Sequence, residues 1–461
     1  MGKYFGTDGF RGEAGVALTV EHAFKIGRIL GKLACEKAAD GRGAIVIGRD
    51  TRRSGCMLEQ ALAAGITASG SDAYLLGVIT TPGVAFVTRS NLVDFDFGVM
   101  ISASHNPYQD NGIKVLNNNG EKLEAAVEKT IEDFLDAKTD ELPHMKGAAI
   151  GVTVPYSHAT REYAEFLVSL AAEPAGATAA APFAGCKVAL DCANGSASGW
   201  AEYIYRKLGA DVQVLSAEPD GLNINVNCGS THMGALQQFV VDKGCDLGFA
   251  FDGDADRCLA VDAAGNVVNG DQLMYLSAIH MKETGRLTSN TVVATVMSNI
   301  GLFKALDAAG IGHRATKVGD KYVYECMANE DHMIGGEQSG HIIFREFATT
   351  GDGMLTSIQI MKAVIASGKS LTELAAPMRM FPQVLKNVRV DSKEGTMADP
   401  DVQAAIAAAD AALEGDGRTL VRPSGTELLI RVMAEASTHE ACEEQVDAII
   451  AVMKEKGHVI A

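Results

Sequence analysis

The sequence predicts an α/β protein with three related α/β domains and a C-terminal α+β domain. Apolar strand-like runs alternate with amphipathic helical patterns along most of the 461 residues. Each of the first three such cycles ends in a polar loop, which suggests a repeated unit. After residue 372 the pattern changes to mixed strands and helices. We therefore place the domains at residues 1–157, 158–257, 258–372 and 373–461. Four domains are consistent with a chain of this length.

Composition narrows the class of protein. The chain is 47% hydrophobic and 21% charged, as expected of a globular protein with large cores. Its net charge is −18 and it has no run of lysine or arginine, so we expect no nucleic-acid partner. The opening lacks an apolar signal core, and no run of 18 apolar residues occurs, so we expect no membrane partner. Nine cysteines without a CxxC pair favour reduced thiols in the cytoplasm, not a zinc site.

The first cycle follows the glycine-rich opening GTDGFRG. Hydrophobic periodicity and breaker residues predict helices over 19–38, 57–68 and 121–136, and strands over 73–76 and 97–101. The run AIVIGRDTR, residues 44–52, predicts a buried strand that leads into a charged turn. An Ala/Gly/Pro-rich stretch, 171–182, predicts a surface connection between the first two cycles.

The later cycles are predicted in the same way. Strands are expected over 187–191, 212–215, 247–251 and 292–295, with helices ending near 208 and covering 302–309. In the last domain we expect strands over 384–390, 419–421 and 429–434, and helices over 400–413 and from 439 onward.

Ser104 is the candidate nucleophile. It lies in SASHNP, where small residues and an Asn-Pro pair force a loop after the strand that ends near Ile101. Folds of this class place their chemistry at the carboxyl ends of strands. A serine there can carry a covalent group, here a phosphoryl group, although such a serine is more often a simple turn or cap residue. His105 follows it directly.

Three aspartates form the candidate metal site. Asp252, Asp254 and Asp256 alternate in FDGDADR, just after the apolar run LGFAF. Carboxylates this close repel one another unless a cation lies among them, and oxygen ligands suit Mg²⁺. An EF-hand is excluded, because Arg257 and Ala263 stand where glycine and glutamate are needed. Arg257 could contact a phosphate oxygen.

Two further loops have residues suited to a phosphorylated sugar. RPSGTE offers Arg422, with Ser424, Gly425 and Thr426 as an anion nest and Arg431 beyond. GGEQSGH offers Glu337 and Ser339 for sugar hydroxyls, and His341 for orientation or proton transfer. Taken alone, each motif could equally be a hairpin or polar turn.

Together these pieces resemble the α-D-phosphohexomutase superfamily. The matching segments are GTDGFRG, ISASHNPYQDNGIK, FDGDADR, GGEQSGH and RPSGTE. They span nearly the whole chain, and five in this order are far more specific than any one. Further segments are similar to the bacterial members that act on glucosamine phosphates, notably GLNINVNCGSTH, KVGDKYV and TTGDG. Ala255, Lys321 and Leu428 depart from the family pattern.

The resemblance implies four domains around one central cleft and a phosphoserine at Ser104. It implies that glucosamine 6-phosphate and glucosamine 1-phosphate interconvert through a 1,6-bisphosphate, which feeds UDP-N-acetylglucosamine synthesis. One Mg²⁺ would bridge the phosphoserine, so its ligands would be Ser104, Asp252, Asp254 and Asp256. The other implied catalytic residues are Arg11, His105, Lys114, Arg257 and His341, with Lys114 as a general acid or base. The implied substrate-binding residues are Glu337, Ser339, Arg422, Ser424, Gly425, Thr426 and Arg431.

Three alternatives stay open at this point. A phosphomannomutase or phosphoglucomutase would use the same residues on another sugar. A magnesium-dependent phosphatase would lose the phosphoryl group from Ser104 to water. A non-catalytic phosphosugar-binding protein would leave Ser104 unmodified. We expect a monomer or a homodimer, and the role of Asn223 to His232 is undetermined.

Overall fold

The computed structural model describes residues 3–6, 8–90, 92–171, 181–424 and 427–460. Contacts divide it into two compact units. The larger comprises the chain up to Met297 together with Ile311–Ala376, and the smaller comprises Ser298–Gly310 with Pro377–Ala461. Gly425 and Thr426, two of the predicted phosphate-binding residues, and most of the predicted connection 171–182 lie outside the described residues. Within the described part, no helix has the length and apolar run needed to cross a membrane.

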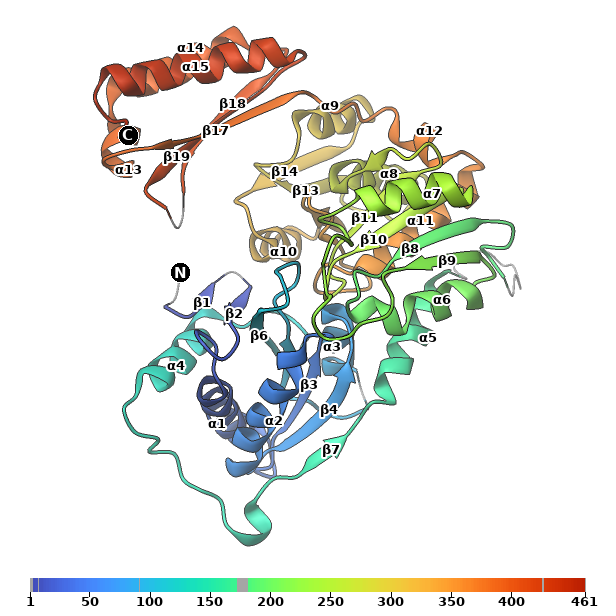
Figure 1. The fold of residues 1–461 in the computed structure, drawn as a ribbon, viewed down its shortest axis with the longest axis vertical. Helices are drawn as coiled ribbons and strands as arrows, with labels where there is room; N and C mark the ends of the chain where they lie inside the picture. Colours follow the sequence, from blue (N-terminus) through green and yellow to red (C-terminus); the bar gives the residue numbers. More distant parts are fainter. Residues whose placement is uncertain (1–2, 7, 91, 172–180, 425–426, 461) are drawn as a thin grey trace. The chain divides into compact units, whose positions relative to one another are not determined.

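The first sheet has seven strands in the order β1-β2-β6-β5-β3-β4-β7 (Figure 1). The strands are β1 (Phe5–Gly6), β2 (Gly9–Glu13), β3 (Ala44–Arg49), β4 (Asp72–Val78), β5 (Phe97–Ile101), β6 (Asp110–Asn117) and β7 (Thr153–Pro155). Its helices are α1 (Val20–Lys37), α2 (Arg53–Ala68), α3 (Thr81–Thr88) and α4 (Ala125–Asp136), with a short 3-10 turn at Gly147–Ala149.

Helices cover both faces of this sheet because its strands are apolar on both sides. Ile45 and Ile47 pack into the core beneath α1, α2 and α4, whereas Val46 packs into a second core that includes residues of α3. Successive side chains of a strand point to opposite faces, so a continuous apolar run needs cover on each. Such a buried sheet is what the run AIVIGR predicted.

The second sheet has five strands in the order β12-β11-β10-β8-β9. Its strands are β8 (Lys187–Asp191), β9 (Asp211–Leu215), β10 (Leu247–Phe251), β11 (Cys258–Asp262) and β12 (Val267–Val268). The accompanying helices are α5 (Ala159–Ala171), α6 (Ala201–Lys207) and α7 (Gly234–Lys243), with a 3-10 turn at Ser196–Gly199.

The third sheet has four strands in the order β14-β13-β15-β16. They are β13 (Thr291–Thr295), β14 (Gly312–Thr316), β15 (Ile334–Gly336) and β16 (Ile342–Phe344). The helices of this region in the larger unit are α8 (Gly270–Glu283), α10 (Asp320–Asn329), α11 (Gly353–Ser367) and α12 (Leu371–Ala375).

One strand pattern occurs in all three sheets. A central strand pairs in parallel with the next strand along the chain on one side and with a later strand on the other. That later strand then pairs antiparallel with its successor, as β5–β6, β10–β11 and β15–β16. The structure thus confirms the three related α/β units that the sequence suggested.

The smaller unit holds the three-stranded antiparallel sheet β17-β19-β18. Its strands are β17 (Gln383–Arg389), β18 (Arg418–Pro423) and β19 (Leu429–Glu435), and its helices are α9 (Ile300–Ala308), α13 (Lys393–Ala398), α14 (Pro400–Ala412) and α15 (His439–Glu455). Figure 1 shows α14 and α15 along this sheet, and their apolar residues share one core with the strands. This is the predicted α+β arrangement.

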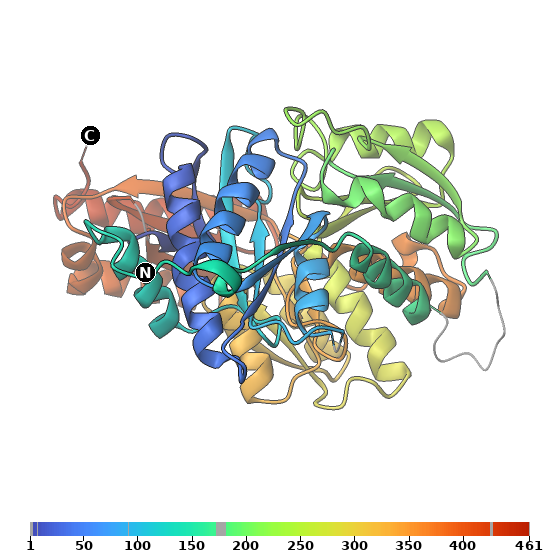
Figure 2. The same cartoon turned by 90° about the horizontal axis from the view of Figure 1, so that it is seen from below.

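Helices α1 and α2 pack side by side over the first sheet (Figure 2). The close approach depends on glycine. A Cβ added at Gly27 would lie 2.2 Å from the Leu62 carbonyl oxygen, and one added at Gly65 would lie 2.1 Å from the Phe24 carbonyl oxygen. Because backbone lies on the other side in both cases, a side chain cannot be accommodated by a rotamer change.

Overpacking usually costs about 1–3 kcal/mol, so we expect Gly65→Ala to lower the free energy of unfolding by up to about 2 kcal/mol. The gain of about 1 kcal/mol in helix propensity offsets only part of this strain. Urea denaturation followed by circular dichroism measures the change. Gly234→Ala is the control, because a methyl group added there on α7 would meet nothing within 4 Å. Equal stability of both variants and the natural chain would contradict the packing argument.

Candidate active site

Three loops of the larger unit form the candidate site, and each occupies the same place in its sheet. Ser104 lies between β5 and β6, the three aspartates lie between β10 and β11, and Glu337 to His341 lie between β15 and β16. Each loop therefore joins a strand to its antiparallel neighbour, at the carboxyl end of the strand that precedes it. The repeat brings three polar loops together from distant parts of the chain.

Ser104 is fully buried and has a left-handed backbone, with a φ of 53°. Its Oγ donates a hydrogen bond of 2.6 Å to Asp252 Oδ2 and lies 3.4 Å from Nδ1 of His105. A left-handed conformation is costly for serine, and such strain is typical of functional positions. Burial and the arginines Arg257 and Arg11 lower the pKa of His105 to about 4, so its ring is neutral at pH 7.

The three aspartates lie close enough together to hold one metal ion. They are buried, and one carboxylate oxygen from each lies within 4.8 Å of the others. Oδ1 of Asp254 and Oδ1 of Asp256 are buried without a hydrogen-bond partner. Burial, with the charges of Asp256 and Asp254, raises the pKa of Asp252 well above its usual range. A hard divalent cation would relieve both the repulsion and the unsatisfied oxygens, so these residues fit a metal ion.

Gly253 brings the metal loop against the Ser104 loop. A Cβ at this position would lie 2.6 Å from the Ser104 carbonyl oxygen and 2.8 Å from Cδ1 of Ile224. Thr81, the first residue of α3, adds two contacts, because its backbone N–H and its Oγ1 donate to the carbonyl and Oδ2 of Asp254 at 3.0 and 2.5 Å. The aspartates are therefore fixed relative to Ser104 by close packing.

Cationic side chains surround the carboxylates. Lys114 Nζ lies 2.7 Å from Oδ2 of Asp254 and 3.3 Å from Oδ1 of Asp8. Burial would lower the pKa of Lys114, but the charges of Asp254, Asp8 and Asp256 outweigh it and raise this pKa above its usual range. In this arrangement Lys114 is a charged partner of the carboxylates. Acid–base chemistry near neutral pH would need a lowered pKa for Lys114. The carboxylates that face Lys114 in this structure have the opposite effect.

The two predicted arginines also lie near the carboxylates. Arg257 donates its backbone N–H to Oδ1 of Asp252 at 3.1 Å, and its Nε lies 3.9 Å from Oδ1 of Asp256. Arg11 pairs with Asp8. The Nε atoms of Arg11 and Arg257 are buried without hydrogen-bond partners, so both side chains have donor capacity left for an anion.

The Glu337–His341 loop packs against the metal loop. Gly340 has a φ of 93° and accepts a hydrogen bond from the Cys258 N–H at 3.0 Å. His341 is buried, with Nδ1 3.7 Å from Asp256 Oδ2, and its Nε2 accepts from the Gly351 N–H at 3.0 Å. Since Nε2 is an acceptor, the fitting neutral tautomer carries its proton on Nδ1, toward Asp256. Glu337 accepts from the Gly319 N–H at 3.1 Å, and Ser339 is exposed.

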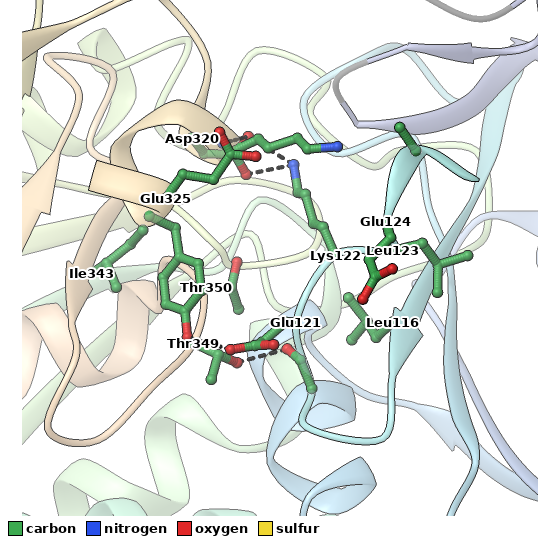
Figure 3. Close-up of a pocket in the computed structure, with 14 residues that line it drawn as sticks. Leu116, Glu121, Lys122, Leu123, Glu124, Asp320, Glu325, Ile343, Thr349 and Thr350 are labelled. Carbon is green, nitrogen blue, oxygen red and sulfur yellow. Dashed lines mark hydrogen bonds and ion pairs between the residues drawn. The ribbon is translucent and has the colours of Figure 1, made fainter. Parts of the chain in front are cut away.

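A cavity of about 380 Å³ adjoins this site. Figure 3 shows its two walls, the turn after β6 with Lys122 and the start of α10 with Asp320. Lys122 Nζ lies 2.6 Å from Asp320 Oδ2 and 3.5 Å from Asp8 Oδ1, and Asp320 Oδ2 is 3.5 Å from Nε2 of His341. A smaller cavity shares Lys122 and Asp320 and reaches Lys114. A chain of charged groups thus runs from the cavity to the metal loop.

The predicted phosphate loop lies in the smaller unit, between β18 and β19 as the sequence indicated. Arg422 and Arg431 are directly opposite each other in the antiparallel register. Burial and the charge of Arg431 lower the pKa of Arg422. Like charges in opposing positions destabilise a sheet unless an anion lies between them. Ser424 is buried, and its Oγ accepts from the Glu427 N–H at 3.3 Å.

The α11 helix supports the metal loop from behind. The Gly353 N–H donates to the Ala255 carbonyl at 2.9 Å. Asp352 caps the helix by accepting from the Leu355 N–H at 2.9 Å, and it also accepts from the Tyr163 hydroxyl at 2.8 Å. Asp352 is fully buried, and burial raises its pKa to about 6.

Several residues of this site were not predicted. Asp8 and Lys122 contact Lys114 and Asp320, and a pair of side chains, Arg52 and Asn225, holds the Ser104 loop. Asp8 lies in GTDGFRG and Asn225 in GLNINVNCGSTH, two segments that the sequence singled out without assigning them a role. The predicted helix 121–136 also begins later, at Ala125, because Lys122 bridges back to Leu116.

Comparison with known proteins defines the class. Four family models match in order: phosphoglucomutase/phosphomannomutase domain I over residues 2–142, domain II over 161–265, domain III over 269–381 and the C-terminal domain over 385–452. The chain belongs to the phosphoglucomutase/phosphomannomutase family. As a member of this family, it is an isomerase of the phosphohexomutase type.

Curated relatives are similar to this chain in sequence over their full length. The chain is 53% identical over 460 residues to the phosphoglucosamine mutase of Lachnospira eligens, covering 100% of both chains. It is 50% identical over 454 residues to that of Bacillus subtilis, covering 98% of this chain and 99% of the relative.

Solved structures share the fold. A phosphoglucomutase/phosphomannomutase family protein from Burkholderia thailandensis matches with a TM-score of 0.78 at 22% identity, over 98% of each chain. An Aspergillus fumigatus N-acetylphosphoglucosamine mutase, solved with GlcNAc-6P and magnesium, matches with a TM-score of 0.65 at 18% identity, over 98% of this chain and 96% of that chain.

The raised pKa of Asp352 predicts a pH dependence of stability. Between pH 4 and 6 the folded chain holds a proton that the unfolded chain, with a carboxyl pKa near 3.8, has lost. This residue's contribution to stability therefore falls as pH rises through that window, by up to about 3 kcal/mol, and is constant above it. Asp352→Asn keeps the cap and cannot titrate.

We expect the stability of Asp352→Asn, relative to the natural chain, to rise from pH 4 to pH 7. Urea unfolding at each pH measures the difference between the two chains, which removes the titration of all other groups. A stability difference between the two chains that is constant across pH 4–7 would contradict a raised pKa for the buried Asp352 carboxyl.

Proposed function

We propose that the protein interconverts glucosamine 6-phosphate and glucosamine 1-phosphate, through a phosphoserine at Ser104 and a 1,6-bisphosphate intermediate. The observation that carries the proposal is the buried Ser104 hydroxyl, hydrogen-bonded to Asp252 within a cluster of three carboxylates. The curated relatives that are 50–53% identical are phosphoglucosamine mutases, which favours this sugar over mannose or glucose. The 1-phosphate product suits synthesis of UDP-N-acetylglucosamine.

The reaction consists of two phosphoryl transfers. In the first, the P–Oγ bond of phosphoserine breaks, a bond from phosphorus to sugar O1 forms, and the proton of the O1 hydroxyl passes through an acid–base group to Ser104 Oγ. The resulting 1,6-bisphosphate reorients. In the second, the P–O6 bond breaks, a bond from phosphorus to Ser104 Oγ forms, and the proton of the serine hydroxyl passes to O6, which leaves the 1-phosphate. Each transfer requires in-line geometry and neutralisation of charge on the equatorial oxygens.

Mg²⁺ is the proposed metal, with Ser104 (as phosphoserine), Asp252, Asp254 and Asp256 as its ligands. The unsatisfied oxygens of Asp254 and Asp256 and the all-oxygen donor set support this choice. When bound, the ion neutralises phosphoryl charge.

The remaining residues would bind and orient the reacting groups. Arg11 and Arg257, whose Nε atoms have no partner, would contact phosphoryl oxygens. Lys114 remains the candidate acid or base, since a cation among the aspartates would take up the carboxylate charge that now raises its pKa. His341 is a second candidate, because Nδ1 is the nitrogen left to carry a proton. His105, neutral at pH 7, would orient the Ser104 loop.

The sugar and the second phosphate would use separate loops. Glu337 and Ser339 are the proposed partners of the sugar hydroxyls. The opposed Arg422 and Arg431, with Ser424, Gly425 and Thr426, are the proposed site for the phosphate that does not react. The four predicted domain ranges remain a proposal, as does a monomer or homodimer. Nine unpaired cysteines support a cytoplasmic location.

Phosphorus NMR tests the proposed substrate. Glucosamine, mannose and glucose 6-phosphates are supplied separately with Mg²⁺ and a trace of the matching 1,6-bisphosphate. We expect a 1-phosphate signal to appear fastest from glucosamine 6-phosphate. Faster conversion of the mannose or glucose compound would reassign the sugar, and release of inorganic phosphate alone would indicate a phosphatase.

Ser104→Ala is the companion variant in that experiment. It removes the proposed phosphoryl carrier, so no 1-phosphate should form, while glucosamine 6-phosphate still binds in calorimetry. Ser339→Ala, which changes an exposed loop serine, should retain turnover with weaker binding. Appreciable turnover by Ser104→Ala would refute the phosphoserine.

Asp254→Asn tests the metal site. Loss of one charged ligand should raise the Mg²⁺ concentration that gives half-maximal rate at least about tenfold and lower the maximal rate. EDTA should stop the natural enzyme, and added Mg²⁺ should restore it. Asp242→Asn, the same charge change at an exposed position, is the control. Full activity in EDTA would argue against any metal role.

A further inference from the structure

Asn225 lies in the segment Gly221–His232, whose role the sequence left undetermined. We propose that Asn225 is a positioning residue that holds the Ser104 loop in register with the metal loop, so that the phosphoryl group on Ser104 is aligned for transfer. The proposal rests on the proposed phosphoserine function and assigns a residue to it.

Asn225 lies between β9 of the second sheet and α7, and its side chain contacts the Ser104 loop. Its side-chain Nδ2 donates to the Ser104 carbonyl at 2.9 Å and to the Asn106 carbonyl at 3.0 Å. A carboxamide nitrogen has two hydrogens, so both are used. The side chain is buried, so both of these hydrogen bonds are shielded from solvent.

Arg52, which belongs to the α/β unit of the first sheet, donates hydrogen bonds to the same two carbonyls. Its Nη2 donates to the Ser104 carbonyl at 2.9 Å and to the Asn106 carbonyl at 2.8 Å. Asp50 accepts from Arg52 Nε at 2.8 Å and from the Ser102 hydroxyl at 2.6 Å, and that hydroxyl in turn accepts from the Ser104 N–H at 2.9 Å.

Both backbone polar groups of Ser104 are therefore held by side chains. This explains how a serine keeps a left-handed backbone with a φ of 53°. Left-handed residues other than glycine cost on the order of 1–2 kcal/mol and persist where the surroundings determine them. Asn225 and Arg52 hold this backbone from two different parts of the chain.

Asn225 and its segment also connect the Ser104 loop to the second sheet, which carries the metal ligands. Its own N–H donates to the Ala193 carbonyl at 2.9 Å, and the Ser230 N–H donates to the Phe251 carbonyl at 2.9 Å. Phe251 is the residue before Asp252. At Gly253, an added Cβ would lie 3.0 Å from Asn225 Nδ2 and 2.6 Å from the Ser104 carbonyl oxygen. The nucleophile, the metal loop and Asn225 therefore meet at one point.

The function follows from the geometric demand of the reaction. Phosphoryl transfer needs the donor oxygen, phosphorus and acceptor oxygen in line, and a displacement of about 1 Å can cost about 100-fold in rate. Arg52 holds the loop only to the sheet that carries Ser104. Asn225 adds a direct hydrogen-bonded link to the separate sheet that carries the aspartates, so it helps to hold Ser104 at a fixed distance from those ligands.

The chain offers a matched control in Asn227. It lies two residues away with a left-handed φ of 53°, close to the 60° of Asn225, but its side chain is exposed. Asn225→Ala and Asn227→Ala therefore impose the same change on a left-handed backbone, and only the first removes the contacts to Ser104. Asn225→Asp keeps the side-chain shape but replaces the donor by an oxygen that faces two carbonyls.

The experiment measures single-turnover transfer from phosphoenzyme. Each protein is loaded with ³²P from a labelled 1,6-bisphosphate, mixed with glucosamine 6-phosphate and Mg²⁺, and quenched at intervals. The rate constant is read per phosphoenzyme, so poorly folded molecules that cannot be loaded do not enter it. We expect it to fall about 10- to 100-fold in Asn225→Ala and Asn225→Asp and to stay within twofold in Asn227→Ala. The KM for glucosamine 6-phosphate, measured in steady-state turnover, should change less than threefold.

Two results would overturn the positioning role. The first is transfer by both Asn225 variants within twofold of Asn227→Ala, and the second is a loss confined to KM. Failure of the natural enzyme to transfer its label would instead refute the phosphoserine function itself. A merely structural Asn225 would lower the thermal midpoint and the loaded fraction while leaving the transfer rate constant unchanged.

Discussion

Burial of three carboxylates within 4.8 Å of one another is the constraint on which the rest of the larger unit depends. Ionised groups this close and this far from water require positive charge around them. Lys114 contacts Asp254 and Asp256, and Arg257 borders the cluster from the same loop. The cluster therefore draws side chains from three sheets to one place, and the same negative charge makes it suited to a divalent cation.

The repeated strand pattern makes this convergence possible. Each of the three loops leaves a strand and returns antiparallel beside it, so it is short and held at both ends. Glycines then allow the loops to touch through their backbones, at Gly253 against Ser104 and at Gly340 against Cys258. A site built from loops with anchored ends is rigid enough for chemistry that depends on alignment.

Much of the fold could be predicted from the sequence because local signals were strong. The strand at Lys187–Asp191 was predicted at its observed bounds, and the helix predicted over 400–413 was observed as Pro400–Ala412. Strand β6 was missed, since the polar residues after Asn106 indicated only a loop. Its pairing with β5 and β2 comes from tertiary contacts. Ser104 and the aspartates were predicted as separate motifs, whereas Asp8, Lys122 and Asn225 were not assigned any role.

The sequence by itself determined the chemical types at the site, because a serine after a strand and alternating aspartates restrict the chemistry wherever they fold. The tertiary structure decided which of these groups meet. Ser104 and Asp252 are 148 residues apart in the chain, and their 2.6 Å hydrogen bond depends on the packing of two sheets. The charge state of Lys114 was decided there too, since Asp8 and Asp254 come from different units of the repeat. Local pattern carries no information on such distances, which only the packed chain fixes.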